Sequence, residues 1–123
     1  MGDIYLGEVE SRFADIIWNN EPLSSRLLAE LALEKLNWKK STTYTVLKRL
    51  CDRGIFRNDN GTVRSVLSKG EYLAIQSESF VEETFDGSLP AFVAAFTSRN
   101  RLSPEEIRQL QRLIDANRED GVC

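Results

Sequence analysis

Residues 38–54, WKKSTTYTVLKRLCDRG, decide how this chain folds. Ser41 is a favoured helix N-cap, because its hydroxyl can accept a hydrogen bond from a backbone N–H of the first turn. Gly54 is a favoured residue just past a helix end, since glycine takes positive φ without strain. The apolar residues between them recur at helical spacing: Val46, Leu47 and Leu50, with Thr43 and Cys51 beside them. The stretch therefore predicts an amphipathic helix.

The opposite face of this helix carries short hydrogen-bonding side chains, one aromatic ring and cations. These residues are Ser41, Tyr44, Thr45 and Lys48, with Arg49 on the flank. A merely solvated helix face usually holds Glu and Lys pairs four residues apart. Two interpretations follow, a surface helix of a small bundle or a recognition helix for nucleic acid, and the residue types favour the second.

The residues after Gly54, IFRNDNGTVRSVL (55–67), predict a β-hairpin. Asn60-Gly61 between two β-competent runs is a strong hairpin signal, because both residues tolerate positive φ. Arg57 and Arg64 fall on its two arms. A capped helix followed at once by a basic hairpin is typical of a winged helix, in which the helix enters the major groove and the wing contacts the flanking backbone.

Two more amphipathic helices are predicted upstream. The first covers residues 6–18, and the second begins with Ser24 or Ser25 as its N-cap. Their apolar stripes are Val9, Phe13, Ile16 and Ile17 in the first helix, and Leu27, Leu28, Leu31, Ala32 and Leu36 in the second. Trp38 is expected to plug the core under the turn into the third helix. This order of elements predicts a winged helix-turn-helix domain over residues 1–69.

Three further helices are predicted after the hairpin, and we assign residues 70–123 to a helical dimerisation domain. Residues 68–85 form the first, Ser88 caps the second, and Ser103-Pro104-Glu105-Glu106 is a capping box with Pro at the first helical position. Such short helices either fold back onto the first domain or are shared by two chains, and we favour sharing. The candidate dimerisation residues are Phe80, Phe85, Phe92, Phe96, Ile107, Leu110 and Ile114. The predicted fold class is thus mainly α with a small β-hairpin wing.

The charge of the chain is unevenly distributed. Residues 38–69 hold 8 Lys and Arg against 2 Asp and Glu, although the net charge of the whole chain is −3. Residues 1–37 hold 3 against 7, and residues 70–123 hold 5 against 10. A basic segment between acidic ends would confine a polyanion to the predicted helix and wing.

We therefore expect double-stranded DNA as a partner, bound by a homodimer. The candidate DNA-binding residues are Lys39, Lys40, Ser41, Thr42, Tyr44, Thr45, Lys48, Arg49, Arg57 and Arg64. Tyr44 and Thr45 are expected to reach base edges, and the cations to meet phosphates. The sequence leaves two roles open for Arg49: a phosphate contact, or a salt bridge to Asp52 or to a Glu of the first helix.

Several other classes of protein are disfavoured. The chain has no His, and its two cysteines, Cys51 and Cys123, form no ligand cluster, so we expect no enzyme, no metal site and no cofactor. There is neither an apolar run of 18 residues nor a signal peptide, and the cysteine usage fits a reducing compartment. We therefore expect a cytoplasmic protein without membrane insertion. The rival class is a winged-helix module that binds an acidic protein partner.

Seven residues of the third helix and its flanks stand in the pattern W-x3-T-x2-T-x-L-x-R-L-x3-G: Trp38, Thr42, Thr45, Leu47, Arg49, Leu50 and Gly54. Two further stretches accompany them, Gly7-Glu8-Val9-Glu10 ahead of Ile17-Trp18, and Leu102-Ser103-Pro104-Glu105-Glu106-Ile107. On these residues, and from about Leu6 to Asn117, the chain resembles the BlaI/MecI/CopY family of penicillinase and methicillin-resistance repressors and their copper-responsive relatives. The copper-responsive branch carries a C-terminal cysteine cluster, whereas this chain has only Cys123 there, so we do not expect copper sensing.

The resemblance implies a dimeric winged-helix repressor that binds palindromic operators and is inactivated by proteolysis in its C-terminal domain. The scissile bond of the penicillinase-type repressors is Asn-Phe, and the matching residues here are Ala95 and Phe96. The implied partner is a membrane-bound metalloprotease sensor or another protease. From spacing alone, Phe96 is a core residue one helical turn after Phe92, and release by a ligand without proteolysis is the alternative. Tyr44 stands where the penicillinase repressors commonly have Arg.

Overall fold

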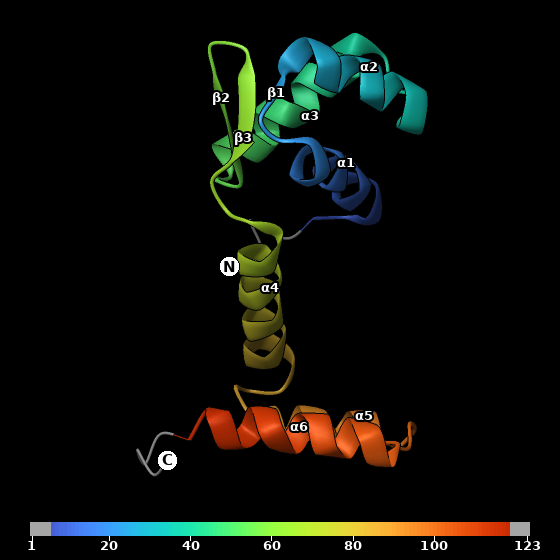
Figure 1. Ribbon diagram of the computed structural model, residues 1–123, viewed down its shortest axis with the longest axis vertical. Coiled ribbons are helices and arrows are strands. Elements are labelled where there is room, and N and C mark those ends of the chain that lie inside the picture. Colours follow the sequence, from blue (N-terminus) through green and yellow to red (C-terminus); the bar gives the residue numbers. More distant parts are fainter. Residues whose placement is uncertain (1–5, 119–123) are drawn as a thin grey trace. The chain divides into compact units, whose positions relative to one another are not determined.

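The computed structural model describes residues 6–118 (Figure 1), in which helices predominate and three short strands form one antiparallel sheet. The predicted fold class, mainly α with a small β wing, is confirmed. Residues 1–5, predicted as a loose lead-in, and Cys123, in a tail predicted to fray, lie outside the described residues. Contacts divide the chain into two compact units, one up to Phe80 and one from Val81 on. We describe each unit by itself.

The first unit holds a three-helix domain with its sheet. Its elements are α1 (Glu8–Asn20), β1 (Leu23–Ser24), α2 (Ser25–Leu36), α3 (Lys40–Asp52), β2 (Phe56–Asp59) and β3 (Thr62–Ser65). The strand order is β1-β3-β2, and both pairings are antiparallel. The two-residue β1 was not predicted, because it is too short to show an alternating pattern and exists only through its pairing with β3.

The β2–β3 hairpin follows the prediction closely. Asn60 and Gly61 both have positive φ, at 53° and 93°, as a two-residue turn requires. The Asn58 side-chain oxygen accepts a hydrogen bond from the Gly61 N–H at 2.9 Å, which tightens the turn. The hairpin is therefore specified by local sequence.

One hydrophobic core holds this unit together. Its largest fully buried side chains are Phe13, Ile17, Leu28, Leu50, Ile55, Phe56 and Val63. The Trp38 ring lies 5.0 Å from that of Phe13, which confirms the predicted plug. Two stripe residues were predicted wrongly, since Val9 is 48% and Leu27 42% exposed. Both lie in the first turn of their helices, and Leu6, just before α1, is buried instead.

The start of α3 also differs from the prediction. Lys39 is the N-cap residue and the helix begins at Lys40, so Ser41 lies inside the first turn and caps nothing. The packing of Trp38 on the core sets where the chain turns, and it outweighs an N-cap preference of about 1 kcal/mol. Gly54, with φ 84°, follows the end of α3 as predicted. In α2, Ser24 is the N-cap and its hydroxyl accepts from the Leu27 N–H.

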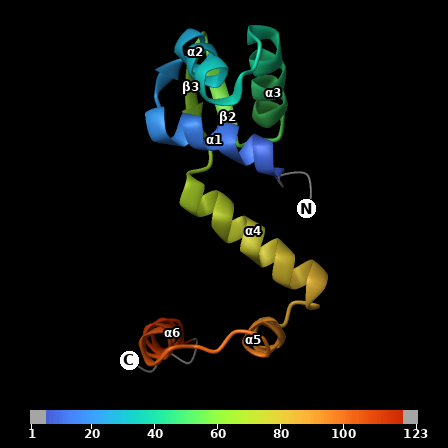
Figure 2. The same ribbon diagram turned by 90° about the vertical axis from the view of Figure 1, so that its right-hand side faces the viewer.

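Three helices follow the hairpin, α4 (Lys69–Thr84), α5 (Leu89–Thr97) and α6 (Pro104–Ala116). The predicted caps are confirmed, since Ser88 accepts from the Ala91 N–H and Ser103 exchanges hydrogen bonds with Glu106. Figure 2 looks nearly along α5 and α6, which lie beside each other in the second unit. Neither helix buries a residue.

Candidate nucleic-acid interface

The recognition candidate α3 has one buried and one exposed face. Its buried residues are Thr43, Val46, Leu47 and Leu50. On the other side, Ser41, Thr42, Thr45, Lys48 and Arg49 are exposed and Tyr44 is half-buried. The division between apolar and polar faces that the sequence predicts is therefore present, and the two candidate base-reading side chains lie on the outer face.

The beginning of α3 is basic. Lys39 and Lys40 are exposed there, and the Lys40 ammonium lies 5.9 Å from the centre of the Tyr44 ring. Lys39 provides no side-chain cap, so the first N–H groups of α3 face outward at the positive end of the helix dipole, where anions bind. Lys48, further along, pairs with Asp52 at 3.3 Å.

Arg49 contacts α1. Its Nη1 lies 2.5 Å from Glu10 Oε2, and Arg53 Nη1 lies 3.7 Å from Oε1 of the same carboxylate. Of the salt bridges that the sequence left open for Arg49, the structure shows the one to a Glu of the first helix. Asp52, the other candidate partner, pairs with Lys48. Glu10 also accepts from the Gly7 N–H at the start of α1. Arg49 therefore fixes α3 against α1.

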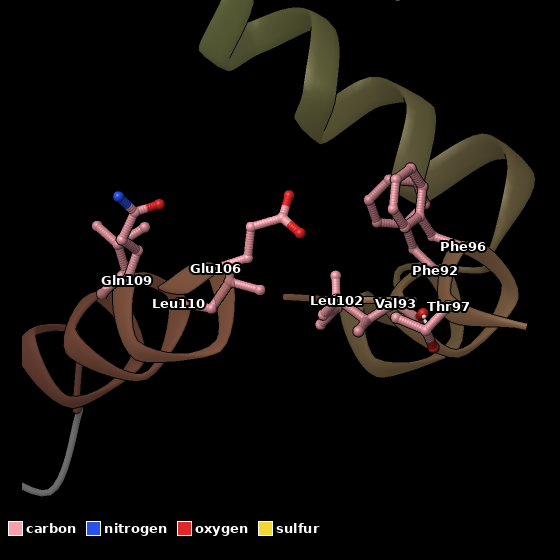
Figure 3. Close-up of a pocket in the computed structure, with 9 residues that line it drawn as sticks. Phe92, Val93, Phe96, Thr97, Leu102, Glu106, Gln109 and Leu110 are labelled. Carbon is pink, nitrogen blue, oxygen red and sulfur yellow. Dashed lines mark hydrogen bonds between the residues drawn. The ribbon is translucent and has the colours of Figure 1, made fainter. Parts of the chain in front are cut away.

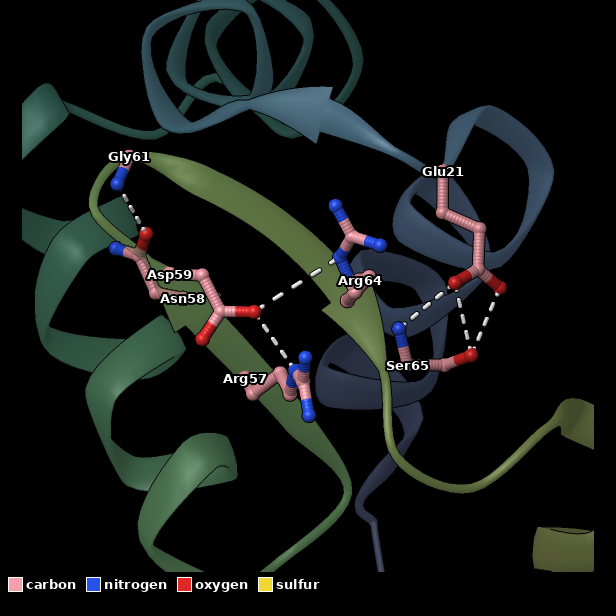
Figure 4. A network of polar contacts seen from close by, with 7 residues as sticks. All are labelled: Glu21, Arg57, Asn58, Asp59, Gly61, Arg64 and Ser65. Atoms are coloured by element: carbon pink, nitrogen blue, oxygen red, sulfur yellow. Dashed lines mark hydrogen bonds and ion pairs between the residues drawn. The ribbon is translucent and has the colours of Figure 1, made fainter.

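The wing carries its two arginines on one face (Figure 4). Arg57 and Arg64 are direct cross-strand partners, and both are exposed. Asp59 Oδ2 accepts a hydrogen bond from Arg57 Nε at 2.7 Å and lies 3.9 Å from Arg64 Nε. The wing therefore presents two arginines that share one carboxylate.

Glu21 anchors the base of the wing, a role that the sequence analysis missed. Its carboxylate accepts from the Ser65 N–H at 2.7 Å and from the Ser65 hydroxyl at 2.8 Å (Figure 4). Ser65 directly follows Arg64, so this contact fixes the strand that carries the arginine. The two residues are 44 positions apart, and no local pattern announces such a pair.

Cys51 lies at the end of α3, half-buried and without a disulfide. Burial raises the pKa of its thiol, and the nearby Asp52 carboxylate raises it further, although Lys48 acts in the opposite direction. A thiol that resists ionisation is a poor nucleophile. Cys51 therefore acts as a packing residue at the edge of the core.

Large apolar side chains are exposed in the second unit and at Phe80, the last residue of the first unit. Of the candidate dimerisation residues, Phe85 and Phe92 are half-buried, and the other five are exposed by 40% to 61%: Phe80, Phe96, Ile107, Leu110 and Ile114. The ring of Phe92 meets that of Phe85 edge to face and that of Phe96 at a tilt, with centroids 5.6 and 6.5 Å apart. Ala95 and Phe96, the residues of the candidate cleavage site, are both exposed in α5.

An open apolar cavity of about 340 Å³ lies between α5 and α6 (Figure 3). Phe92, Val93 and Phe96 line it from α5, and Leu110 and Leu113 from α6. Within residues 6–118, no group of His, Cys, Asp or Glu side chains is arranged to hold a metal ion. No helix in the same range is long and apolar enough to cross a membrane.

Comparisons with known proteins agree with this geometry. Residues 6–116 match the model of a family described as penicillinase repressor. The penicillinase repressor of Bacillus licheniformis is 22% identical over 117 residues, which cover 92% of this chain and 91% of the relative. The methicillin resistance regulatory protein MecI of Staphylococcus aureus is 24% identical over 115 residues, covering 89% and 93%. Both names are those of regulators, in agreement with the expectation that the chain is not an enzyme.

Proposed function

The chain belongs to the penicillinase repressor family, and from this membership we propose that it is a cytoplasmic repressor that binds a palindromic DNA operator as a homodimer. We further propose that repression ends by proteolysis within the second unit. The observation that carries the proposal is the exposed polar face of α3 beside a wing with two arginines. The uneven charge supports it, since the basic segment coincides with these elements.

The roles of the site residues follow from their positions. Thr45 can donate or accept a hydrogen bond at a base edge and place its methyl group on thymine, with Tyr44 beside it in the major groove. Lys39, Lys40 and the first N–H groups of α3 meet phosphates, as do Lys48, Arg57 and Arg64. Arg49 is given the role of holding α3 in place, because its guanidinium pairs with Glu10 of α1.

The exposed apolar side chains of the second unit support the homodimer. Monomers rarely expose large contiguous apolar patches, and such patches mark interfaces. Neither α5 nor α6 has a buried residue. Their packing within one chain therefore leaves the apolar side chains accessible to a second subunit. A two-fold dimer also brings two recognition helices to two half-sites of a palindrome.

Cleavage between Ala95 and Phe96 would end repression by removing α6 from each subunit. The bond lies in the last turn of α5, where the Phe96 carbonyl accepts a hydrogen bond from the Asn100 N–H at 3.1 Å, so this turn must open locally before a protease can act. Two linked half-site contacts would then become two weak independent ones. Mass spectrometry of the protein from induced cells is the measurement, and a fragment ending at Ala95 is expected.

Release by a ligand is the second candidate, favoured by the cavity between α5 and α6. Intact chains during full induction would replace the proteolytic mechanism with this one. The partner is then an apolar small molecule, and the membrane-bound metalloprotease sensor has no part in induction.

A titration of duplex DNA at increasing salt tests the DNA-binding role. If several cations contact phosphates, the logarithm of the affinity falls steeply and linearly with the logarithm of the salt concentration. A palindromic duplex that matches the operator should bind far more tightly than a random one. Binding to an acidic protein but not to either duplex would instead establish the rival class, a protein-interaction module.

A further inference from the structure

A single carboxylate lies between the two arginines of the wing (Figure 4). Arg57 and Arg64 face each other across the β2–β3 ladder, an arrangement in which like charges repel. Asp59 lies two residues after Arg57, so its side chain leaves the same face of the strand. Its Oδ2 lies 2.7 Å from Arg57 Nε and 3.9 Å from Arg64 Nε. One oxygen atom thus offsets the repulsion between two guanidinium groups.

An anionic oxygen of DNA would be held in the same way. Guanidinium N–H groups bind phosphate and carboxylate oxygens with the same geometry. The side chains of the three residues are between 45% and 59% exposed, so a phosphate can reach both arginines. As long as the Asp59 carboxylate stays in place, however, it occupies the Nε–H of Arg57, lies close to the Arg64 guanidinium and repels an approaching phosphate.

We propose that Asp59 is an internal substitute for a DNA phosphate and that it limits how tightly the wing holds the duplex backbone. In the free protein Asp59 offsets one of the two positive charges of the arginine pair; on binding, a phosphate takes over the pair and the carboxylate returns to water. The inference rests on the proposed DNA binding. Wing contacts to phosphate carry no sequence information, so Asp59 weakens binding to random DNA and leaves discrimination to α3.

The test compares Asp59→Asn with Asp15→Asn in the full chain. Each variant removes one negative charge from a carboxylate that pairs with a cation, at 2.7 Å for Asp59 with Arg57 and 2.8 Å for Asp15 with Lys69. Asp15 belongs to α1 and contacts the start of α4, so its variant reports the effect of net charge alone. Far-UV circular dichroism verifies that both variants are folded. If Asp59→Asn does not fold, Asp59→Ser takes its place in the comparison.

Asp59→Asn should bind a random duplex at low salt about threefold more tightly per subunit than Asp15→Asn, the range of one exposed ion pair. Its affinity should also fall more steeply with salt, by about one unit of slope per subunit, because phosphates then displace no internal pair. In a background with Arg57→Gln and Arg64→Gln, the Asp59→Asn substitution should lose most of this effect.

Three results would overturn the inference and leave the proposed DNA binding intact. Equal affinity and slope for the two Asn variants would remove Asp59 from the interface. Weaker binding by Asp59→Asn would mean that the carboxylate orients the arginines for phosphate. An undiminished gain without the arginines would reduce the effect to general charge. Absence of salt-dependent binding by the wild type is a different result, since it would overturn the proposed function as well.

Discussion

The N-terminal unit and the last two helices differ in how far along the chain their contacts reach. In the first unit, the Leu6 N–H donates to the Tyr72 hydroxyl, and the Trp18 Nε1–H to the Leu67 carbonyl, across 66 and 49 positions. Within the described part of α5 and α6, side-chain hydrogen bonds join residues three or four positions apart, as in Thr97 to Val93. The first unit is therefore defined by its own long-range contacts, whereas the side-chain hydrogen bonds of α5 and α6 are local and large apolar side chains of both helices are exposed.

Phe13→Ala should produce the largest effect in either region. Phe13 is fully buried in the core and packs on the Trp38 ring, so truncation should cost about 3–5 kcal/mol in free energy of unfolding. Chemical denaturation followed by Trp fluorescence measures this loss. A cost below about 1 kcal/mol would mean that the core of the first unit is not the main source of its stability.

Phe92→Ala applies the same change to the second unit. Phe92 packs between the Phe85 and Phe96 rings, and it is expected to lie in the proposed dimer interface, where truncation of a central aromatic residue costs about 2 kcal/mol or more of association energy. Sedimentation at micromolar concentration should show a dimer for the wild type and a larger monomer fraction for the variant.

The outcome for Phe92→Ala also bears on the contrast between the units. The Trp fluorescence transition of the first unit should stay close to that of the wild type when dimer dissociation is taken into account. A wild type that sediments as a monomer with full helicity would contradict the shared-helix proposal directly.

Thr45→Ala tests the exposed face of α3 and should have an intermediate effect. Loss of the hydroxyl and methyl contacts to a base is expected to cost about 1–3 kcal/mol of operator binding per half-site and to relax sequence preference. Titrations of operator and random duplex at one salt concentration measure both quantities. Equal losses on the two duplexes would exclude a base-reading role for Thr45.

How well each structural feature could be predicted from the sequence follows the same division between local and long-range contacts. The hairpin turn at Asn60 and the caps at Ser88 and Ser103 depend on neighbouring residues, and each was predicted correctly. The start of α3, which was predicted at the wrong residue, depends on how Trp38 packs on the core, and β1, which was not predicted, depends on its pairing with β3. Neither dependence can be recognised in a short stretch of sequence. The Glu21–Ser65 contact is also long-range and was not predicted. For Arg49, the sequence offered a phosphate contact or a salt bridge, and the structure was needed to identify Glu10 as its partner.

Glu10→Gln and Glu105→Gln give the smallest effects and the sharpest contrast between the two regions. Both substitutions remove a carboxylate that pairs with an arginine, but Glu10 joins α1 to α3, 39 positions away, while Glu105 pairs with Arg108 within one turn of α6. The Glu10 side chain is 19% exposed and that of Glu105 is 57% exposed.

Charge-assisted hydrogen bonds at partly buried sites are worth about 1.5–3 kcal/mol, and exposed helix pairs about 0.3–0.5 kcal/mol. Glu10→Gln should therefore destabilise the first unit measurably and also weaken operator binding, because Arg49 no longer holds α3 in place. Glu105→Gln should leave the unfolding transition of the first unit and operator affinity nearly unchanged. Thermal denaturation and duplex titration of both variants measure these effects. Equal small losses of stability and of operator affinity in the two variants would mean that long-range and local ion pairs contribute equally, which would contradict the contrast between the two regions.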